Sequence, residues 1–186
     1  MNILEKIKKH HKEKKYCRIT TGLKDDFETI VTGYILDYNS DFILLQTTDD
    51  FIIDGYRIIP INFILNIRFN NNDKYLFKIH KLEGIYDKIK SPDYEINISN
   101  WSEIFKSLKK NVQCIISECE AFEQSYFCIG SIKRVNKNSI SIQYFDAQGF
   151  LDDKNTKHKF NEITSVTFED RYSRMFSKHT RKRNKK

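Results

Sequence analysis

The C-terminal end of the chain gathers the side chains best suited to binding a negatively charged partner. Residues 171–186 read RYSRMFSKHTRKRNKK and hold eight Lys or Arg residues and no acidic residue. Cations at this density attract phosphate and release its counterions, which makes such binding sensitive to salt. Tyr172 and Phe176 lie among the cations and could stack on bases. The segment predicts a contact with nucleic acid, and a solubilising tail without a partner is the alternative interpretation.

The residues predicted to bind nucleic acid are Arg171, Tyr172, Arg174, Lys178, Arg181, Lys182 and Arg183. Residues 1–18 are also rich in Lys, whereas residues 19–170 hold more acidic than basic residues, so the formal net charge of +7 arises at the two ends. A partner attracted by charge would therefore meet the ends of the chain first.

Other reactive side chains are present without a recognisable catalytic or metal-binding pattern. Asp49, Asp50 and Asp54 could hold Mg²⁺ or Ca²⁺ through their oxygens, but an Asp-Gly hairpin turn explains the same residues. The five histidines do not form H-E-x-x-H, and the chain contains no P-loop and no G-x-S-x-G motif. We therefore expect no catalytic activity, no metal and no cofactor.

The cysteines and the apolar runs indicate the compartment. Cys17, Cys114, Cys119 and Cys128 form no C-x-x-C pair, which favours buried thiols in a reducing cytosol. No apolar run reaches the length of a membrane span, and the N-terminal sequence does not resemble a secretory signal. We expect a cytoplasmic protein without a membrane, although the Lys-rich first helix could also lie on an anionic membrane surface.

A pattern of glycine, isoleucine, asparagine and glutamine occurs twice in the chain. Residues 33–46 read GYILDYNSDFILLQ, and residues 130–143 read GSIKRVNKNSISIQ. Both segments have the form G-x-I-x-x-x-N-x-[DN]-x-I-x-[LI]-Q. A repeat of this kind predicts an internal duplication, and coincidence in an Ile-rich chain is the alternative.

The same order of elements is expected in both halves. A short amphipathic helix is predicted over residues 3–14 and another over 99–111, each followed by short strands with apolar side chains at alternate positions. Polar turns join the second and third strand of each half. The turn residues are Asn39 and Asp41 in the first half, and Asn136 and Asn138 in the second.

The predicted fold class is mainly β, with two small β-barrels in tandem, each preceded by a short α-helix. Gly33 and Gly130 lie inside strands, where glycine permits the sharp bending that a small barrel needs. The predicted domains are a first barrel over residues 1–79, a linker over 80–98, a second barrel over 99–172 and a basic disordered tail over 173–186.

Both halves resemble the Sm-like superfamily, which includes the Sm and LSm proteins and the bacterial RNA chaperone Hfq. The resemblance rests on the glycine inside a strand, the aliphatic residue two positions later, the polar turn and the aliphatic residue of the next strand. These residues are Gly33, Ile35, Asn39–Asp41 and Leu45 in the first half, and Gly130, Ile132, Asn136–Asn138 and Ile142 in the second. The resemblance implies an SH3-like barrel and RNA binding, and other SH3-like or Tudor-like barrels remain as alternatives.

The sequence departs from the Sm-like pattern at the positions that contact bases. Phe42-Ile43 and Ser139-Ile140 replace the Met-Asn of the family, and Ile58-Ile59-Pro60 replaces its Ile-Arg-Gly. We therefore expect a non-catalytic RNA-binding or ribonucleoprotein-associated protein that contacts RNA through its tail. The alternative is a protein-interaction or assembly module that binds protein partners, or further copies of itself, through the edges of its barrels.

Overall fold

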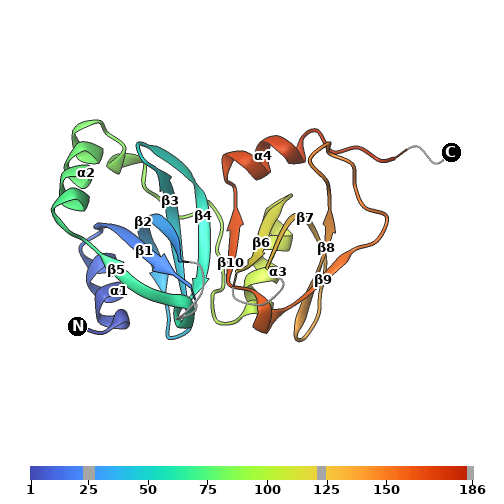
Figure 1. Ribbon diagram of the computed structural model, residues 1–186, viewed down its shortest axis with the longest axis horizontal. Coiled ribbons are helices and arrows are strands. Elements are labelled where there is room, and N and C mark those ends of the chain that lie inside the picture. Colours follow the sequence, from blue (N-terminus) through green and yellow to red (C-terminus); the bar gives the residue numbers. More distant parts are fainter. Residues whose placement is uncertain (23–27, 121–124, 184–186) are drawn as a thin grey trace. The chain divides into compact units, whose positions relative to one another are not determined.

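A computed structural model describes residues 1–22, 28–120 and 125–183, and the fold is mainly β. The chain divides into two compact units, Met1–Tyr94 and Glu95–Lys186. In each unit, a leading helix is followed by strands that pair with their neighbours in antiparallel fashion (Figure 1).

The first unit combines a sheet with two α-helices. Its elements are α1 (Ile3–Lys12), β1 (Tyr16–Thr21), β2 (Thr29–Tyr38), β3 (Phe42–Asp49), β4 (Ile52–Pro60), η1 (Ile61–Phe63), β5 (Ile64–Arg68), α2 (Asn71–Leu82) and η2 (Tyr86–Lys88). The strands lie in the order β5-β1-β2-β3-β4. Helix α1 packs against β2 and β5, and α2 packs against β1.

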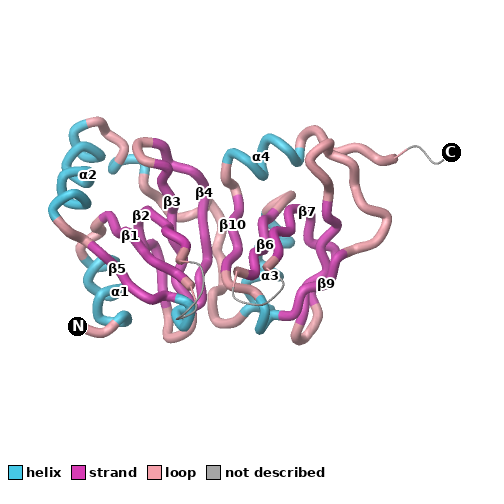
Figure 2. The backbone as a smooth tube through the Cα atoms, viewed as in Figure 1, coloured by secondary structure: helices cyan, strands magenta, loops and turns pink. Residues whose placement is uncertain are grey.

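The second unit has the same strand order. Its elements are α3 (Trp101–Asn111), β6 (Ile115–Cys119), β7 (Tyr126–Val135), β8 (Ser139–Tyr144), β9 (Thr156–Lys159), η3 (Phe160–Glu162), β10 (Ser165–Phe168) and α4 (Arg171–Ser177). The strands lie in the order β10-β6-β7-β8-β9. Helices α3 and α4 both pack against β7 (Figure 2).

The two leading helices were predicted from their apolar periodicity and form as α1 and α3. Each begins at an asparagine whose side chain accepts a backbone N–H: Asn2 from Glu5 and Asn100 from Glu103. Helix α2, helix α4 and strand β9 were not predicted. Helix α2 ends at Leu82, inside the predicted linker, and the backbone N–H of Lys90 donates to the Gln46 side chain.

The sheets are open, which differs from the predicted barrels. Within the described part of the first unit, the outer strands β5 and β4 do not pair with each other, and neither do β10 and β9 in the second. The last strand of each unit is short and pairs with the first strand, β1 or β6. Barrel closure requires strands long enough to tilt and stagger into a continuous ladder, and strands such as Ser165–Phe168 are too short for this.

The repeated sequence positions have repeated geometry. The ladder between the second and third strand is irregular between Ile35 and Asp37 in one unit and between Ile132 and Arg134 in the other. The following turns close through the same hydrogen bond, in which Asn39 N–H donates to the Phe42 carbonyl and Asn136 N–H to the Ser139 carbonyl, at 3.0 and 2.8 Å. These bulges and turns re-aim both strands at equivalent points.

Buried aliphatic and aromatic side chains fill each unit. The first core includes Ile7, Ile19, Ile43 and Leu45, which are fully buried. The second includes Phe105 and Leu108 of α3. All four cysteines are buried, as predicted, and free. Burial raises the pKa of Cys114 and of Cys128 to about 12, so these thiols stay protonated and unreactive.

His80 lies in an aromatic cluster that fastens α2 to the sheet. Its Nδ1 accepts the hydroxyl proton of Tyr34 at 2.7 Å, and its Nε2–H donates to the Asp50 carbonyl at 2.8 Å. The rings of Tyr16 and Phe51 contact His80 edge-on. The hydrogen bond from Tyr34 requires the neutral imidazole, because the protonated ring has no nitrogen that can accept it.

We expect the free energy of unfolding to fall as the pH is lowered below about 6.5, the ordinary histidine pKa. Burial lowers the pKa of His10, His80 and His158 in the folded state, so the unfolded chain binds protons first. Each histidine then contributes a loss of up to about 1.4 kcal/mol per pH unit between 6.5 and its own folded pKa. Urea denaturation at pH 7.5 and 5.5 measures this difference.

His158→Gln should reduce this pH dependence, because it removes one of the three histidines whose pKa is lowered by burial. Glu162 and Asp73 have a lowered pKa in the fold, but both ionise well below this pH range. Equal unfolding free energies at pH 7.5 and 5.5 would contradict the prediction.

Candidate nucleic-acid interface

Helix α4 places three of the predicted binding residues, Arg171, Tyr172 and Arg174, on an ordered surface. The sequence predicted a disordered tail from residue 173, and this prediction is wrong for the residues that form α4. The Asp170 side chain accepts the Ser173 N–H at 3.1 Å, and the Ser173 hydroxyl donates back to the Asp170 carboxylate. Both residues are buried. The polar composition of the segment suggested disorder, and the Asp170 cap was not recognised from the sequence.

The other anchor of α4 is aromatic. Phe176 stacks on Phe145, with ring centroids 6.2 Å apart and planes inclined by 19°. It belongs to the margin of the core cluster that includes Ile116 and Ile129. A seven-residue helix would not form alone, so the cap and this contact determine its position. Phe176 was expected to stack on bases but instead packs against the protein.

Two exposed aromatic side chains lie next to each other beside this anchor. Tyr172 is 49 % exposed and Phe127, at the start of β7, is 50 % exposed. Their ring centroids are 6.3 Å apart, and Tyr172 also contacts Phe176 at 4.6 Å. The ring of Phe176 therefore holds Tyr172 in place while leaving much of the surface of Tyr172 accessible. Phe127 was missed by sequence reasoning, because nothing local connects β7 with α4.

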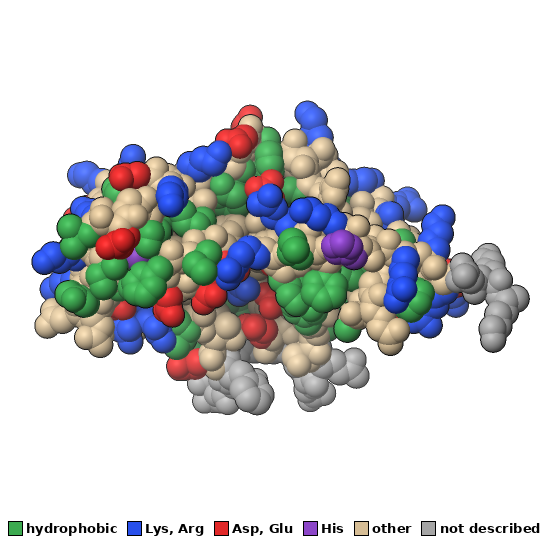
Figure 3. All heavy atoms as spheres, turned by 90° about the horizontal axis from the view of Figure 1, so that it is seen from above, with side chains coloured by type: hydrophobic (Ala, Val, Ile, Leu, Met, Phe, Trp, Pro, Cys, Tyr) green, Lys and Arg blue, Asp and Glu red, His purple; other side chains and the backbone are tan. Residues whose placement is uncertain are grey.

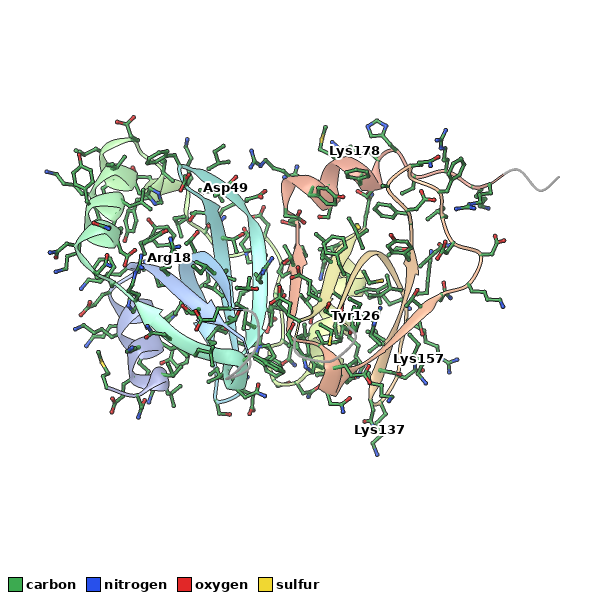
Figure 4. All side chains as sticks on the ribbon, viewed as in Figure 1. Arg18, Asp49, Tyr126, Lys137, Lys157 and Lys178 are labelled. Carbon is green, nitrogen blue, oxygen red and sulfur yellow. The ribbon has the colours of Figure 1, made fainter. Side chains whose placement is uncertain are left out.

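Exposed cations lie on the same helix as Tyr172. Arg171, Arg174 and Lys178 are exposed and follow one another at helical spacings of three and four residues. The space-filling view shows Lys and Arg side chains beside hydrophobic surface over α4 (Figure 3). Lys178 lies at the end of α4, far from Lys137 and Lys157 at the other end of the unit (Figure 4). Like charges at these spacings repel one another, and a polyanion would relieve that repulsion.

The chain beyond α4 is fastened to the loop after β8. Arg181 N–H donates to the Gly149 carbonyl at 2.8 Å, and Leu151 N–H donates to the Arg181 carbonyl at 2.9 Å. Gly149 has a φ of +78°, and a Cβ at this position would lie 2.8 Å from the His179 carbonyl oxygen. Only glycine allows this approach. The sequence Asp146-Ala147-Gln148-Gly149 signals a turn, but it does not reveal which segment meets it.

Arginine side chains cover the ring of Phe150 in this region. The guanidinium carbons of Arg181 and Arg183 lie 4.2 and 5.4 Å from the ring centroid. Arg183 also forms an ion pair with Asp146 at 2.9 Å. Backbone N–H groups of Phe150 and Gln148, together with Arg183, hold the pKa of the Asp146 carboxyl below its usual range. Arg181 and Arg183 therefore have structural partners.

A shallow hollow of about 700 Å³ opens at this place. It is lined by Asp146, Gln148, Phe150, Arg181, Lys182 and Arg183. Its three cations outnumber its single carboxylate. The structure thus divides the seven predicted binding residues between the exposed face of α4 and the segment that borders this hollow.

The predicted turn residues have structural roles. The Asn39 side chain accepts the N–H groups of Asp41 and Phe42, both at 2.7 Å, and the Asp41 carbonyl accepts the N–H of Ile61. In the second unit, the Asn136 side chain donates to the Ser139 hydroxyl at 3.3 Å. The Asn138 carbonyl accepts the N–H of Phe160 at 3.1 Å. These contacts stabilise the turns, and none of them involves α4.

Asp49, Asp50 and Asp54 lie at and beside a hairpin turn of the first unit. Asp49 ends β3, Asp50 follows it with a φ of +46°, and Asp54 lies in β4. Among the residues that the structure describes, no three His, Cys, Asp or Glu side chains gather where they could hold a metal ion. In the neighbouring run Tyr56–Ile64, which could offer an apolar edge to a protein partner, Tyr56, Ile58 and Ile59 are buried.

No protein-family model, curated protein or solved structure matches this chain. Of the helices within the described ranges, none combines the length and apolar composition needed to cross a bilayer.

Proposed function

We propose that the chain is a non-catalytic, cytoplasmic RNA-binding or ribonucleoprotein-associated protein that contacts single-stranded RNA through α4 and residues 178–183. The observation that supports this most directly is the exposed pair of Tyr172 in α4 and Phe127 in β7, with the exposed cations Arg174 in α4 and Lys178 at its C-terminal cap. Stacking surfaces next to backbone-binding cations are the usual elements of single-strand binding sites. The buried, protonated thiols agree with a reducing compartment.

The proposal includes the Sm-like resemblance and an internal duplication. Each unit would be an open form of the Sm-like sheet rather than a closed barrel. The shared strand order, the bulges after Ile35 and Ile132, and the matching turns at Asn39 and Asn136 support this relationship. The base-contacting residues of that family are absent, so the contact with RNA is assigned to α4.

Tyr172→Ala tests the stacking part of the proposal. We expect affinity for a labelled single-stranded RNA to fall about tenfold, because stacking of a base on an aromatic side chain contributes about 1–3 kcal/mol. The dependence of affinity on salt should remain unchanged, since no charge is removed. Fluorescence anisotropy with the full chain, at several salt concentrations, measures both quantities.

Tyr75→Ala is the matched control, because Tyr75 is an exposed tyrosine of α2 in the other unit. It should bind RNA as the unaltered chain does. The stacking proposal would have to be abandoned if Tyr172→Ala bound as tightly as Tyr75→Ala, or if the unaltered chain lost all binding at moderate salt.

A second candidate function is protein assembly through the outer strands. Within their own units, β5 pairs only with β1 and β9 only with β8 in the described residues, so each strand has an outer edge. Such edges can accept a further strand. Lys157, Lys159 and Arg68 place charges there, which opposes pairing. Oligomers measured by light scattering without RNA would favour this function over the first.

A further inference from the structure

A second cavity lies entirely within the first unit, and none of the residues predicted to bind nucleic acid lines it. Its volume is about 460 Å³, and it is bounded by the end of α1, the middle of β2 and the segment after η2. This volume falls in the range of about 300–1,000 Å³ that is usual for small-ligand pockets. The segment after η2 is fastened to the sheet by the hydrogen bond between Lys90 N–H and the Gln46 side chain, at 2.8 Å.

The charged lining of this cavity is entirely basic. Lys12, Lys14 and Lys90 border it together with His11, and no Asp or Glu is among its lining residues. Lys90 pairs with Asp93 at 2.8 Å, outside the cavity. Lys12 and Lys14 have no ion-pair partner within the described ranges, so their ammonium groups are available to an anion.

Lys14 has an unfavourable backbone conformation at this site. Its φ is +45°, in the left-handed region just after the end of α1, where glycine or asparagine is usual. A lysine here strains the backbone and places a cation at the mouth of the cavity. Residues held in such conformations concentrate at binding sites, and glycine would relieve the strain.

The remaining walls are apolar and aromatic. Tyr86 and Ile89 line the cavity and are only partly buried, and the ring of Tyr86 packs edge-on against Tyr34 at 5.9 Å. His11 is fixed by donating from Nε2 to the Leu36 carbonyl at 3.0 Å and by an edge contact with Tyr38. A planar ring could lie on this fixed wall while its anionic group meets the lysines.

We propose that this cavity binds a small phosphate ester that carries a planar ring, such as a nucleoside monophosphate. Lys12 and Lys14 hold the phosphate, and Tyr86 with Ile89 contacts the ring. None of its lining residues belongs to α4, so the proposal extends the function proposed above without depending on it.

Isothermal titration calorimetry of the full chain with adenosine 5′-monophosphate, at low salt, tests the proposal. We expect saturable binding with one site per chain, and binding of adenosine or orthophosphate at least about tenfold weaker, because each supplies only half of the contacts. No saturable binding of the monophosphate, or equal binding of orthophosphate, would overturn the proposal.

Lys14→Gly distinguishes an effect on monophosphate binding from an effect on stability. The variant should melt at a higher temperature because the backbone strain is relieved, and together with Lys12→Gln it should bind the monophosphate about tenfold more weakly. Lysines that only offset the carbonyl charge at the end of α1 would leave monophosphate affinity unchanged, which would refute the site.

Two control variants show where the monophosphate binds. Lys8→Gln with Lys9→Gln changes two exposed lysines of α1 that do not line the cavity, and affinity should stay the same. Neutralising Arg174, Lys178 and Lys182 should also leave it unchanged. Loss of monophosphate binding in that tail variant would assign the ligand to the proposed RNA site and overturn this inference, whatever the outcome for RNA.

Discussion

Gly130→Ala is expected to lower the free energy of unfolding by about 3 kcal/mol or more, near the upper end of what overpacking usually causes. A Cβ at this position would collide with the Gln143 carbonyl oxygen and lie 2.7 Å from the carbonyl carbon, although real Cβ contacts essentially never fall below 3.0 Å. The obstacle is backbone in the paired strand β8, so no side-chain rotation relieves it. Strands β7 and β8 would have to separate locally. Urea denaturation measures the loss.

Gly33→Ala should have a similar effect, because its Cβ would meet the Gln46 carbonyl oxygen in the corresponding place. Gly84→Ala is the control for backbone conformation alone. Gly84 has a φ of +66°, but the nearest atom to its added Cβ is 4.0 Å away. Gly84→Ala should lower the free energy of unfolding by only about 1–2 kcal/mol. Equal losses for Gly130→Ala and Gly84→Ala would show that close strand approach is not the reason for glycine.

Gly33 and Gly130 illustrate what the sequence could predict. A glycine inside an apolar strand, followed by a polar turn, indicated a sharp bend at both positions. The strands and leading helices followed from local periodicity, which each segment contains within itself. Closure of the sheets could not be predicted in the same way, because it depends on strand lengths and stagger across the unit. Strand β9, with the polar sequence Thr156–Lys159, gives almost no local signal.

The candidate site was predictable only in part, for the same reason. Charge density identified Arg174 and Lys178, and aromatic content identified Tyr172. The residues that organise them are distant in sequence: Phe145 supports α4, and Phe127 lies beside Tyr172. Such contacts exist only in the folded unit. The sequence therefore predicted a disordered tail, although it contains both the capping residue Asp170 and the aromatic anchor Phe176.

Because α4 is a folded helix, its cations can bind a polyanion at defined positions. A disordered basic tail binds any polyanion through a diffuse atmosphere of cations, whereas a fixed helix holds its cations at set distances from Tyr172. Arg181 and Arg183 are committed to Phe150, and Arg183 also pairs with Asp146. Arg174, Lys178 and Lys182 are exposed and form no ion pair within residues 125–183, so they can be neutralised without disturbing the fold.

Replacing Arg174, Lys178 and Lys182 together by Gln should weaken single-stranded RNA binding about 100-fold at 0.1 M salt. Each phosphate contact with a single strand contributes about 0.7 to the slope of log affinity against log salt, so three lost contacts lower that slope by about 2. The melting temperature should hardly change, because no buried contact is removed. Anisotropy titrations between low and moderate salt give both the affinity and the slope.

The charge-matched control is Lys133→Gln, Lys137→Gln and Lys157→Gln, three exposed lysines of the same unit. Lys137 and Lys157 lie at the end of the unit opposite to Lys178 (Figure 4). Both variants have the same net charge, so attraction by overall charge alone would weaken RNA binding equally in the two. A loss confined to the α4 variant would mean that phosphates are bound at defined positions beside Tyr172. Equal losses would reduce the interface to nonspecific charge and leave assembly through the outer strands as the better function.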